Sequence, residues 1–343
     1  MMTPPRAVVV FVIAAGCAAL AQDRDSDADV RAVISQQLRF SASELADLQR
    51  GRVVKHGLPS RAPGEVAVVG AVRVRATKAS FFERVRDIAR FKSGPQVLQI
   101  GRFSNPPVLD DLAALTVSKE DFDVRSCHAG DCGIRLPADT IARFAREVDV
   151  KAPDAQARGA ALFKQMLFDD VAAYMSGGRN RMLQFDDGPK AIRPHDELEG
   201  VLANMPELAA LVPGLPDHLL HFPQSRLPDA EDFLYWSKEK FGQEPFITVT
   251  HVTIVCRPAA VTCVMTTRDV YSSRYLDASV ALAIATDVQG DPGAFDLIYE
   301  NRSRANALKG TLSGLRRSLT ERRARGGLED SLKSIKLRLE KGG

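Results

Sequence analysis

The segment from Phe246 to Glu340 constrains the fold of this chain more than any other, because several β-strand patterns run directly into one long helix pattern. The strand patterns are rich in Val, Ile, Thr and Tyr and are separated by Pro, Gly and Asp. They cover Phe246 to Val255, Val264 to Val270, Tyr275 to Val288 and Phe295 to Tyr299. The helix pattern begins near Ser303 and continues to the C-terminus. This order predicts a sheet wrapped around a closing helix.

The layout resembles the START-like superfamily of lipid-transfer, ligand-binding and polyketide cyclase proteins. The strands above and the ending YENRSRANALKGTLSGLRRSLTERRARGGLEDSLKSIKLRLE carry the resemblance, which covers roughly half of the chain. It implies an α+β fold in which a curved antiparallel sheet grips a long C-terminal helix over an apolar cavity. START-like domains begin with a strand and a helix, and the patterns from Glu65 to Ala76 and from Lys78 to Phe91 fit these two elements. A further strand is expected from Val97 to Phe103.

The middle of the chain departs from this layout, because its apolar residues recur at helical spacing. The expected helices run from Asp139 to Val148, Ala155 to Met175, Pro194 to Met205 and Asp229 to Phe241. We therefore expect a START-like domain over 65–343 that is interrupted by a helical insertion at about 136–243. The insertion either caps the cavity mouth or stands beside the domain. A separate N-terminal segment over 22–64 should contain a short helix that opens with the capping box Ser41 to Glu44.

The first residues read as an export signal. Arg6 precedes an apolar run that ends in the small-residue pattern Ala19 to Ala21, which predicts a signal peptide over 1–21. The run is too short to span a bilayer comfortably. We expect a mature protein without a transmembrane span, in the periplasm or secreted. The alternative is a lipid anchor at Cys17, because the small residues of Ala14 to Gly16 precede that cysteine.

The four remaining cysteines are spaced as two close pairs. In an oxidising compartment, Cys127 with Cys132 and Cys256 with Cys263 should form two local disulfides. The alternative is a zinc site built from all four cysteines, but only the first pair has the hook spacing that such sites use. We expect neither a metal nor a cofactor.

The chain carries 46 Lys and Arg against 43 Asp and Glu, so it is nearly neutral. This balance argues against a dedicated nucleic-acid partner.

The closing helix carries two leucine stripes that cannot both face one sheet. The first stripe is Leu308, Leu312, Leu315 and Leu319, and the second is Leu328, Leu332, Ile335 and Leu339. At about 100° per residue the stripes lie on opposite sides of a straight helix. We expect Leu312 and Leu315 to lie under the sheet. The helix should then kink near Gly326, or its last part should pack on another element.

Several polar and aromatic residues are candidates for a ligand site. Tyr271, Tyr275 and Asp277 share one strand parity and could line a cavity, although an aromatic pair on an outer face is the plainer reading. His251 is a candidate base or a hydrogen-bonded histidine at a sheet surface. Arg316 and Arg323 lie near the first leucine stripe, where they could meet an acidic group or could simply be solvated.

Two further motifs carry weaker signals. His218 and His221, three residues apart with Asp217 adjacent, could meet on one helical turn as metal ligands, but no third-ligand spacing follows. Trp236 is either a core residue or an aromatic lid over the cavity.

The sequence therefore favours an exported protein that binds an apolar or amphipathic small molecule, such as a lipid, between the sheet and the C-terminal helix. One alternative is a cyclase-type or hydrolase-type enzyme that uses His251 with Tyr271, Tyr275 or Asp277 in the same cavity. Another is a cell-envelope scaffold whose insertion binds a protein partner. No residue is assigned a catalytic role.

Overall fold

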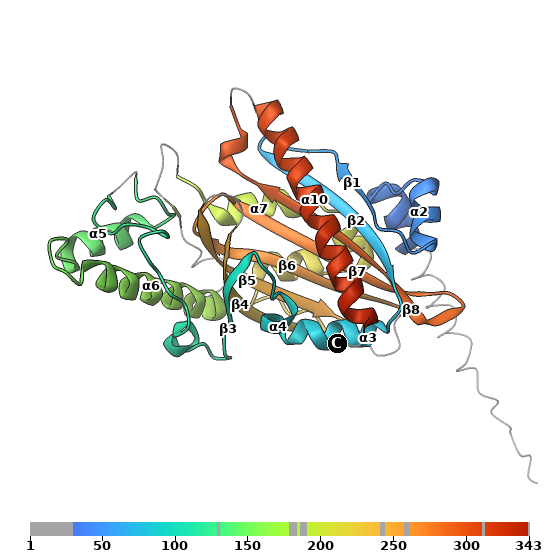
Figure 1. Cartoon of the computed structure of the whole chain (residues 1–343), viewed down its shortest axis with the longest axis horizontal. Helices are drawn as coiled ribbons and strands as arrows, with labels where there is room; N and C mark the ends of the chain where they lie inside the picture. The colour runs from blue at the N-terminus through green and yellow to red at the C-terminus, as the bar shows by residue number, and fades with distance from the viewer. Residues whose placement is uncertain are drawn as a thin grey trace, which may run out of the picture.

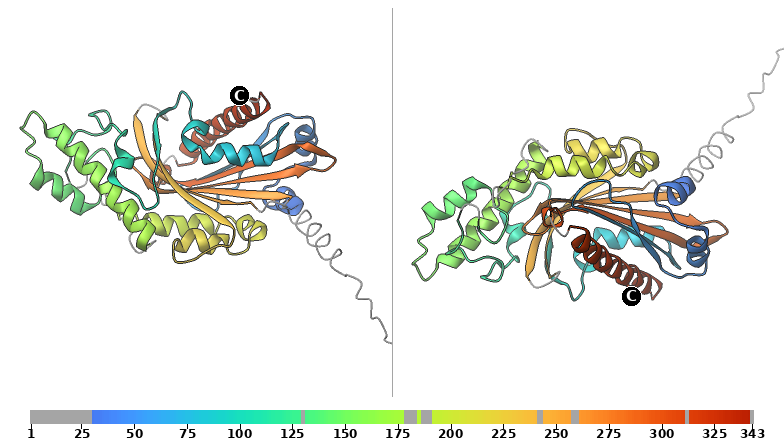
Figure 2. Two further views of the ribbon diagram at one scale, coloured as in Figure 1. Left: turned by 90° about the horizontal axis from the view of Figure 1, so that it is seen from below. Right: turned by 90° about the horizontal axis from the view of Figure 1, so that it is seen from above.

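The computed structural model describes residues 30–128, 131–177, 184–185, 191–240, 244–256, 261–310 and 313–341. Within these residues eight strands form one antiparallel sheet in the order β1-β2-β8-β7-β6-β5-β4-β3 (Figure 1). The strands are β1 (Val54–Leu58), β2 (Glu65–Val74), β3 (Val97–Arg102), β4 (Ala230–Lys240), β5 (Pro245–Val255), β6 (Thr262–Ser272), β7 (Ala278–Val288) and β8 (Asp291–Arg304). The sheet bends toward one side at β3 and β4 (Figure 2).

Helices cover both faces of this sheet. The longer ones are α2 (Ala42–Gln49), α3 (Lys78–Arg86), α5 (Ala138–Glu147), α6 (Ala155–Gly177), α7 (Pro194–Leu202) and α10 (Ser313–Glu340). The shorter ones are η1 (Val33–Gln37), α4 (Ile88–Phe91), η2 (Leu109–Leu112), α8 (Glu207–Leu211), α9 (Leu215–His221) and η4 (Asn306–Leu308). The mixed α+β fold with a long C-terminal helix on an antiparallel sheet confirms the predicted class, and this layout is compatible with a helix grip.

One face of the sheet packs against α3, α4 and α10. Its core joins valines of β2 to Phe81, Phe82 and Phe295 and to leucines of α10. α10 lies across β2 and the edge strand β1 and does not reach the middle of the sheet (Figure 1). Val66, Val68, Val72 and Val74, at alternate positions of β2, face the layer that contains α10.

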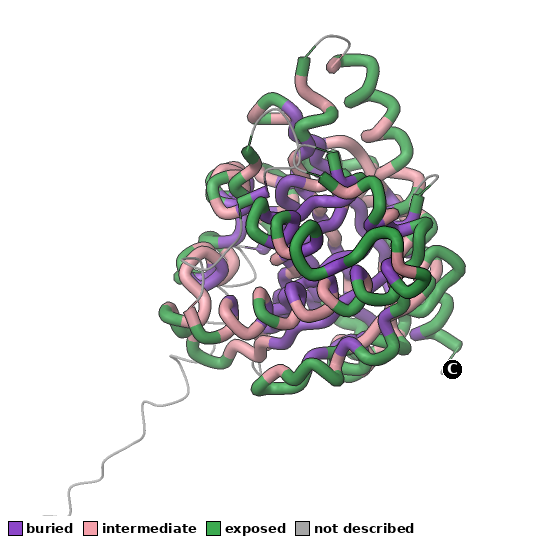
Figure 3. Tube along the Cα trace, turned by 90° about the vertical axis from the view of Figure 1, so that its left-hand side faces the viewer, coloured by how far each residue is buried: buried purple, intermediate pink, exposed green. Residues whose placement is uncertain are grey.

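The opposite face packs against two groups of helices (Figure 2). α2 and α7 to α9 cover the half of the sheet that contains β1, β2 and β7. α5 and α6 and the chain before them cover the half that contains β4 and β5. Buried residues run through the middle of the molecule between these layers (Figure 3).

The prediction of a helix from Asp229 to Phe241 is wrong, because Ala230–Lys240 forms strand β4 of the sheet. Phe233 and Tyr235 face α3 and α4, whereas Leu234 and Trp236 face the other layer. A strand that is covered on both faces shows no polar alternation, so its apolar run resembles a buried helix. The first three expected helices are present as α5, α6 and α7.

The prediction for the leucine stripes is also wrong in its orientation. α10 is one unbroken helix that begins at Ser313, with no interruption at Gly326. Its second stripe packs on the sheet, where Leu332 is 1% exposed, while Leu315 is 61% exposed and Leu319 is 48% exposed. The two stripes do lie on opposite sides, and the sheet selects the second one. Leu312 lies outside the described residues.

Both predicted disulfides are present, Cys127 with Cys132 and Cys256 with Cys263. None of the described helices combines the length and the apolar character that a membrane crossing needs. The expected signal peptide and Cys17 lie outside the described residues, so the export signal stays a prediction.

Candidate functional site

The predicted site residues do not gather in one cavity. His251 is fully buried on the face of the sheet that α6 covers, away from α10. Tyr271 and Asp277 are buried near Arg135, while Tyr275 is 42% exposed in the turn after β6. Arg316 and Arg323 are exposed on α10.

His251 belongs to a hydrogen-bonded network that five elements build. The Nε and Nη2 groups of Arg268 on β6 donate to the hydroxyl oxygen of Tyr174 on α6. Because a guanidinium only donates, the Tyr174 hydroxyl donates its own proton to Nδ1 of His251 at 2.8 Å. Nε2 of His251 then donates to Asp232 on β4 at 3.0 Å, and His218 on α9 donates to the same carboxylate at 3.1 Å.

The electrostatics of this network follow from burial and from the shared carboxylate. Burial lowers the pKa of His251 to about 4, so its imidazole is neutral at pH 7. Burial opposes the charge on Asp232, but hydrogen bonds from His218 and His251 hold its pKa well below the usual range. The bond to Asp232 outweighs burial at His218 and raises the pKa of that imidazole.

This network serves the packing of α6 and α9 on the sheet. The ring of Phe222 lies 4.4 Å from the His251 ring and 5.4 Å from the Tyr174 ring. Both nitrogens of the His218 ring are used, by Asp232 and by the carbonyl of Ser225. An enzyme that uses His251 with Tyr271, Tyr275 or Asp277 does not fit this arrangement, because the partners of His251 are Tyr174 and Asp232.

The proposed metal ligands also separate. His218 points into the buried network, while His221 pairs with Asp217 at 2.7 Å on the outside of α9. Across the described part of the chain, no group of three or more His, Cys, Asp or Glu side chains is placed to hold a metal ion.

Tyr271 and Asp277 meet through a third residue. The Tyr271 hydroxyl donates to the backbone carbonyl of Arg135 at 2.9 Å, and the Arg135 guanidinium donates to Asp277 at 2.6 Å. Trp236 is fully buried and donates to the carbonyl of Asp111 at 2.8 Å. These residues attach the chain before α5 to the sheet and line no cavity beneath α10.

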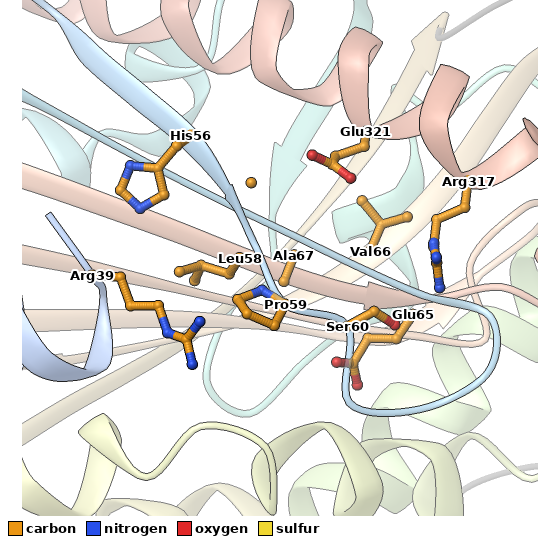
Figure 4. Close-up of a pocket in the computed structure, with 11 residues that line it drawn as sticks. Arg39, His56, Leu58, Pro59, Ser60, Glu65, Val66, Ala67, Arg317 and Glu321 are labelled. Atoms are coloured by element: carbon orange, nitrogen blue, oxygen red, sulfur yellow. The ribbon is translucent and has the colours of Figure 1, made fainter. Parts of the chain in front are cut away.

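A cavity of about 490 Å³ does lie beneath α10, at the open edge of the sheet (Figure 4). It surrounds the end of β1, with Arg39 and His56 on one side and Arg317 and Glu321 of α10 on the other. The remaining lining comes from β1, β2 and the loop between them, at Gly57, Leu58, Pro59, Ser60, Glu65, Val66 and Ala67.

The cavity wall on α10 continues the stripe that packs on the sheet. Counting back from Leu328 by seven and eleven residues gives Glu321 and Arg317, which are positions on the same side of a helix. The stripe is therefore apolar over the C-terminal half of α10 and charged over the N-terminal half. Where it becomes charged, the helix and the sheet edge enclose a polar space.

Most charges at this cavity are already compensated. Glu65 is fully buried and accepts hydrogen bonds from Asn204 at 2.7 Å and from Arg302 at 2.7 Å. Burial opposes its charge, yet the hydrogen bonds lower the pKa of Glu65 below its usual value. His56 contacts the Glu44 carboxylate at 2.8 Å and the Leu38 carbonyl at 2.9 Å.

Glu321 is fixed by the close approach of α10 to β1. A Cβ atom at Gly57 would lie 2.0 Å from the Glu321 carboxylate, so the carboxylate would have to move if any other residue replaced Gly57. Glu321 also pairs with Arg325 one turn later, at 3.7 Å. In contrast, no hydrogen bond or ion pair from the described residues reaches the guanidinium of Arg39 or of Arg317. The cavity is therefore lined by two exposed arginines without a charged partner, which lie on opposite sides of β1 (Figure 4).

Two other hollows lie along α10. A space of about 410 Å³ adjoins the first cavity and shares Ser60 and Arg317 with it. A larger groove of about 1000 Å³ runs between α3, α4 and the C-terminal half of α10. Arg338 lines this groove and donates to the Phe91 carbonyl at 2.9 Å.

A polar cluster also occupies the sheet face near β4 to β8, beyond the reach of α10. Lys92 donates to Glu239 at 2.6 Å, and Thr250 donates to Asp269 at 3.2 Å. Burial raises the pKa of Asp269 to about 7 and that of Tyr299 to about 12. Asp269 and Tyr299 are both partly exposed to solvent.

The sequence indicated the helix of this cavity but not its residues. The first leucine stripe predicts Arg316 and Arg323 as binding residues, whereas the cavity is lined by Arg317. Extending the second leucine stripe toward the N-terminus would have found Arg317 and Glu321. No sequence pattern marks Arg39, which enters the cavity from the turn before α2 in a left-handed conformation with φ of 59°.

Comparison with models of known protein families gives no match, and comparison with curated proteins gives none at the threshold used.

Proposed function

We propose that this chain is an exported binding protein of the START-like type, and that it holds a small amphipathic anion between the sheet edge and α10. The observation that carries the proposal is the pair of uncompensated arginines, Arg39 and Arg317, in a cavity of about 490 Å³. This volume lies within the usual range for small-molecule sites, about 300–1,000 Å³.

The chemistry of the cavity supports an acidic head group. A guanidinium binds carboxylate or phosphate oxygens through charge-assisted hydrogen bonds, and each of the two walls offers one such group. The polar lining disfavours a purely apolar ligand. Leu58, Pro59 and Val66 offer apolar surface for a short tail, so the ligand has an acidic head and an apolar part.

The two disulfides support export, because such bonds persist in oxidising compartments. The antiparallel sheet with its C-terminal helix supports the START-like assignment, although here the helix covers the edge strand β1 and its neighbour β2.

Octanoate is a suitable probe, and calorimetric titration would test the proposal. We expect octanoate to bind. Octanol should bind more weakly because it lacks the carboxylate, and acetate because it lacks the apolar tail. Arg39→Ala and Arg317→Ala should each weaken octanoate binding roughly tenfold to a hundredfold, the usual value of a charge-assisted hydrogen bond. Arg322→Ala is the matched control, because Arg322 is exposed on the same half of α10 but is absent from the cavity lining. Equal binding of octanoate and octanol, or unchanged binding by both cavity variants, would contradict the proposal.

A second candidate function is acid–base catalysis at Asp269. Its carboxyl titrates near neutrality on a partly exposed sheet face, while Lys92 and Ser237 hold Glu239 ionised. Two carboxyl groups with opposite pKa shifts are a frequent arrangement in acid–base enzymes. A panel of p-nitrophenyl esters tests this function: hydrolysis should change with a pKa near 7, and Asp269→Asn should abolish it. Hydrolysis that survives Asp269→Asn would exclude Asp269 as the catalytic acid.

A protein partner for the α5 to α9 region stays a prediction.

A further inference from the structure

The outer side of the N-terminal half of α10 exposes two large apolar side chains. Leu315 is 61% exposed and Leu319 is 48% exposed, and they lie one helical turn apart. They face away from the sheet because the opposite stripe of α10 makes the packing contact. Together they form a small exposed apolar patch on the outer side of α10.

Arginines surround these leucines. The segment 313–326 contains five arginines against one glutamate, while the whole chain has a net charge of +3. The single glutamate, Glu321, lies on the cavity side of the helix together with Arg317 and its partner Arg325, so three of the five arginines, Arg316, Arg322 and Arg323, lie on the leucine side. Arg322 and Arg323 are exposed and make no hydrogen bond or ion pair with any described residue, and Arg316 donates only to the Ala307 carbonyl at 3.2 Å.

Counting about 100° per residue, Leu315, Leu319, Arg322 and Arg323 fall within one continuous arc of α10. The leucines occupy the arc and the arginines border it. This is the composition of a helix that lies in the plane of a membrane surface, with apolar side chains in the acyl boundary and cations at the head groups.

We propose that this face of α10, defined by Leu315, Leu319, Arg316, Arg322 and Arg323, docks onto an anionic phospholipid surface. Neither component is sufficient alone: two leucines bury too little area for stable insertion, and the arginines supply the attraction to negative head groups. Nucleic acid is a poorer partner, because it offers no apolar layer for the leucines and the rest of the chain is nearly neutral. Docking places the cavity on the other side of the same helix turns.

Vesicle flotation with the purified protein tests this inference. Vesicles of phosphatidylcholine mixed with phosphatidylglycerol should carry the protein, and vesicles of phosphatidylcholine alone should not. The charge reversal R322E/R323E should weaken binding at least about tenfold. The double variant L315E/L319E should remove binding even at low salt. All four residues are exposed, so the melting temperature of each variant should match that of the unaltered protein.

Leu337→Glu provides the matched control. Leu337 is 53% exposed on the same side of α10, but its half of the helix carries Glu329, Asp330 and Glu340 among its cations. This substitution should leave vesicle binding unchanged. Arg317→Ala should also leave it unchanged, so a failure of the docking inference and a failure of the proposed ligand cavity are distinguishable.

Three results would overturn the inference. One is the absence of binding to anionic vesicles, and another is equal loss of binding in Leu337→Glu and L315E/L319E. The third is tight binding to duplex DNA by a protein that does not float with vesicles, which would identify the arginines as a nucleic-acid surface.

Discussion

The two halves of α10 use the same side of one helix for different purposes. In the C-terminal half, Leu328, Leu332 and Leu339 pack on the sheet and are at most 7% exposed. In the N-terminal half, Arg317 and Glu321 occupy the equivalent positions and line a cavity. The comparison teaches that one continuous helix stripe can provide stability at one end and a polar binding wall at the other.

The largest expected loss of stability comes from replacing Glu65, which lines the cavity beneath the N-terminal half of α10. Glu65 is the buried partner of Arg302, and the other acidic neighbour of Arg302, Glu300, has a pKa that burial raises well above its usual value. Glu65→Gln therefore leaves the buried Arg302 guanidinium with Glu300 alone, a carboxyl whose charge burial disfavours, and should lower the free energy of unfolding by about 3–5 kcal/mol. Urea denaturation checks this. A loss of less than about 1 kcal/mol would show that the ion pair of Glu65 with Arg302 does not stabilise the sheet beneath the N-terminal half of α10.

The next prediction compares the stability that a leucine contributes in each half of α10. Leu332→Ala should lower the free energy of unfolding by about 2–5 kcal/mol, because a fully buried leucine is replaced by a cavity. Leu315→Ala, a substitution of the same kind on an exposed side chain, should change it by less than about 0.5 kcal/mol. Equal losses in the two variants would mean that both stripes pack and that the comparison is wrong.

The smallest expected effect is a pH dependence of stability that comes from Asp269, on the part of the sheet that α10 does not cover. The pKa of Asp269 is about 7 in the folded chain against 3.8 as a model value. The native state therefore holds a proton that the unfolded state releases, so stability contributed by this group is present below pH 3.8 and is lost as pH rises through 7. Asp269→Asn should raise the melting temperature at pH 8 more than at pH 5. An equal change at both pH values would exclude a protonated Asp269.

Much of the sheet could be predicted from the sequence, because the strands that form β5 to β8 are bounded by Pro, Gly or Asp and are rich in β-branched residues. The sequence does not mark β1, because Val54–Leu58 is short and contains Gly57. The pattern of β4 resembles that of a helix, because both faces of this strand are covered. Local periodicity reports how much of an element is buried but not by what.

The residues of the candidate site are even harder to predict from local periodicity than the strands are. Two leucine stripes of equal quality face opposite sides of α10, and only the position of β2 beneath the helix decides which is core. The network around His251 draws its other members from α6, α9, β4 and β6, and Arg39 reaches the cavity from a turn that precedes the sheet. Contacts between elements so distant in the sequence leave no local pattern.

Native mass spectrometry of the protein purified from its own host tests the central claim most directly, when the unaltered chain is compared with Arg39→Ala/Arg317→Ala. We predict a copurifying amphipathic acid on the unaltered chain and its absence from the double variant, with both proteins folded. No copurifying ligand, a neutral apolar ligand, or the same ligand retained by the double variant would contradict the assignment of this cavity as the binding site.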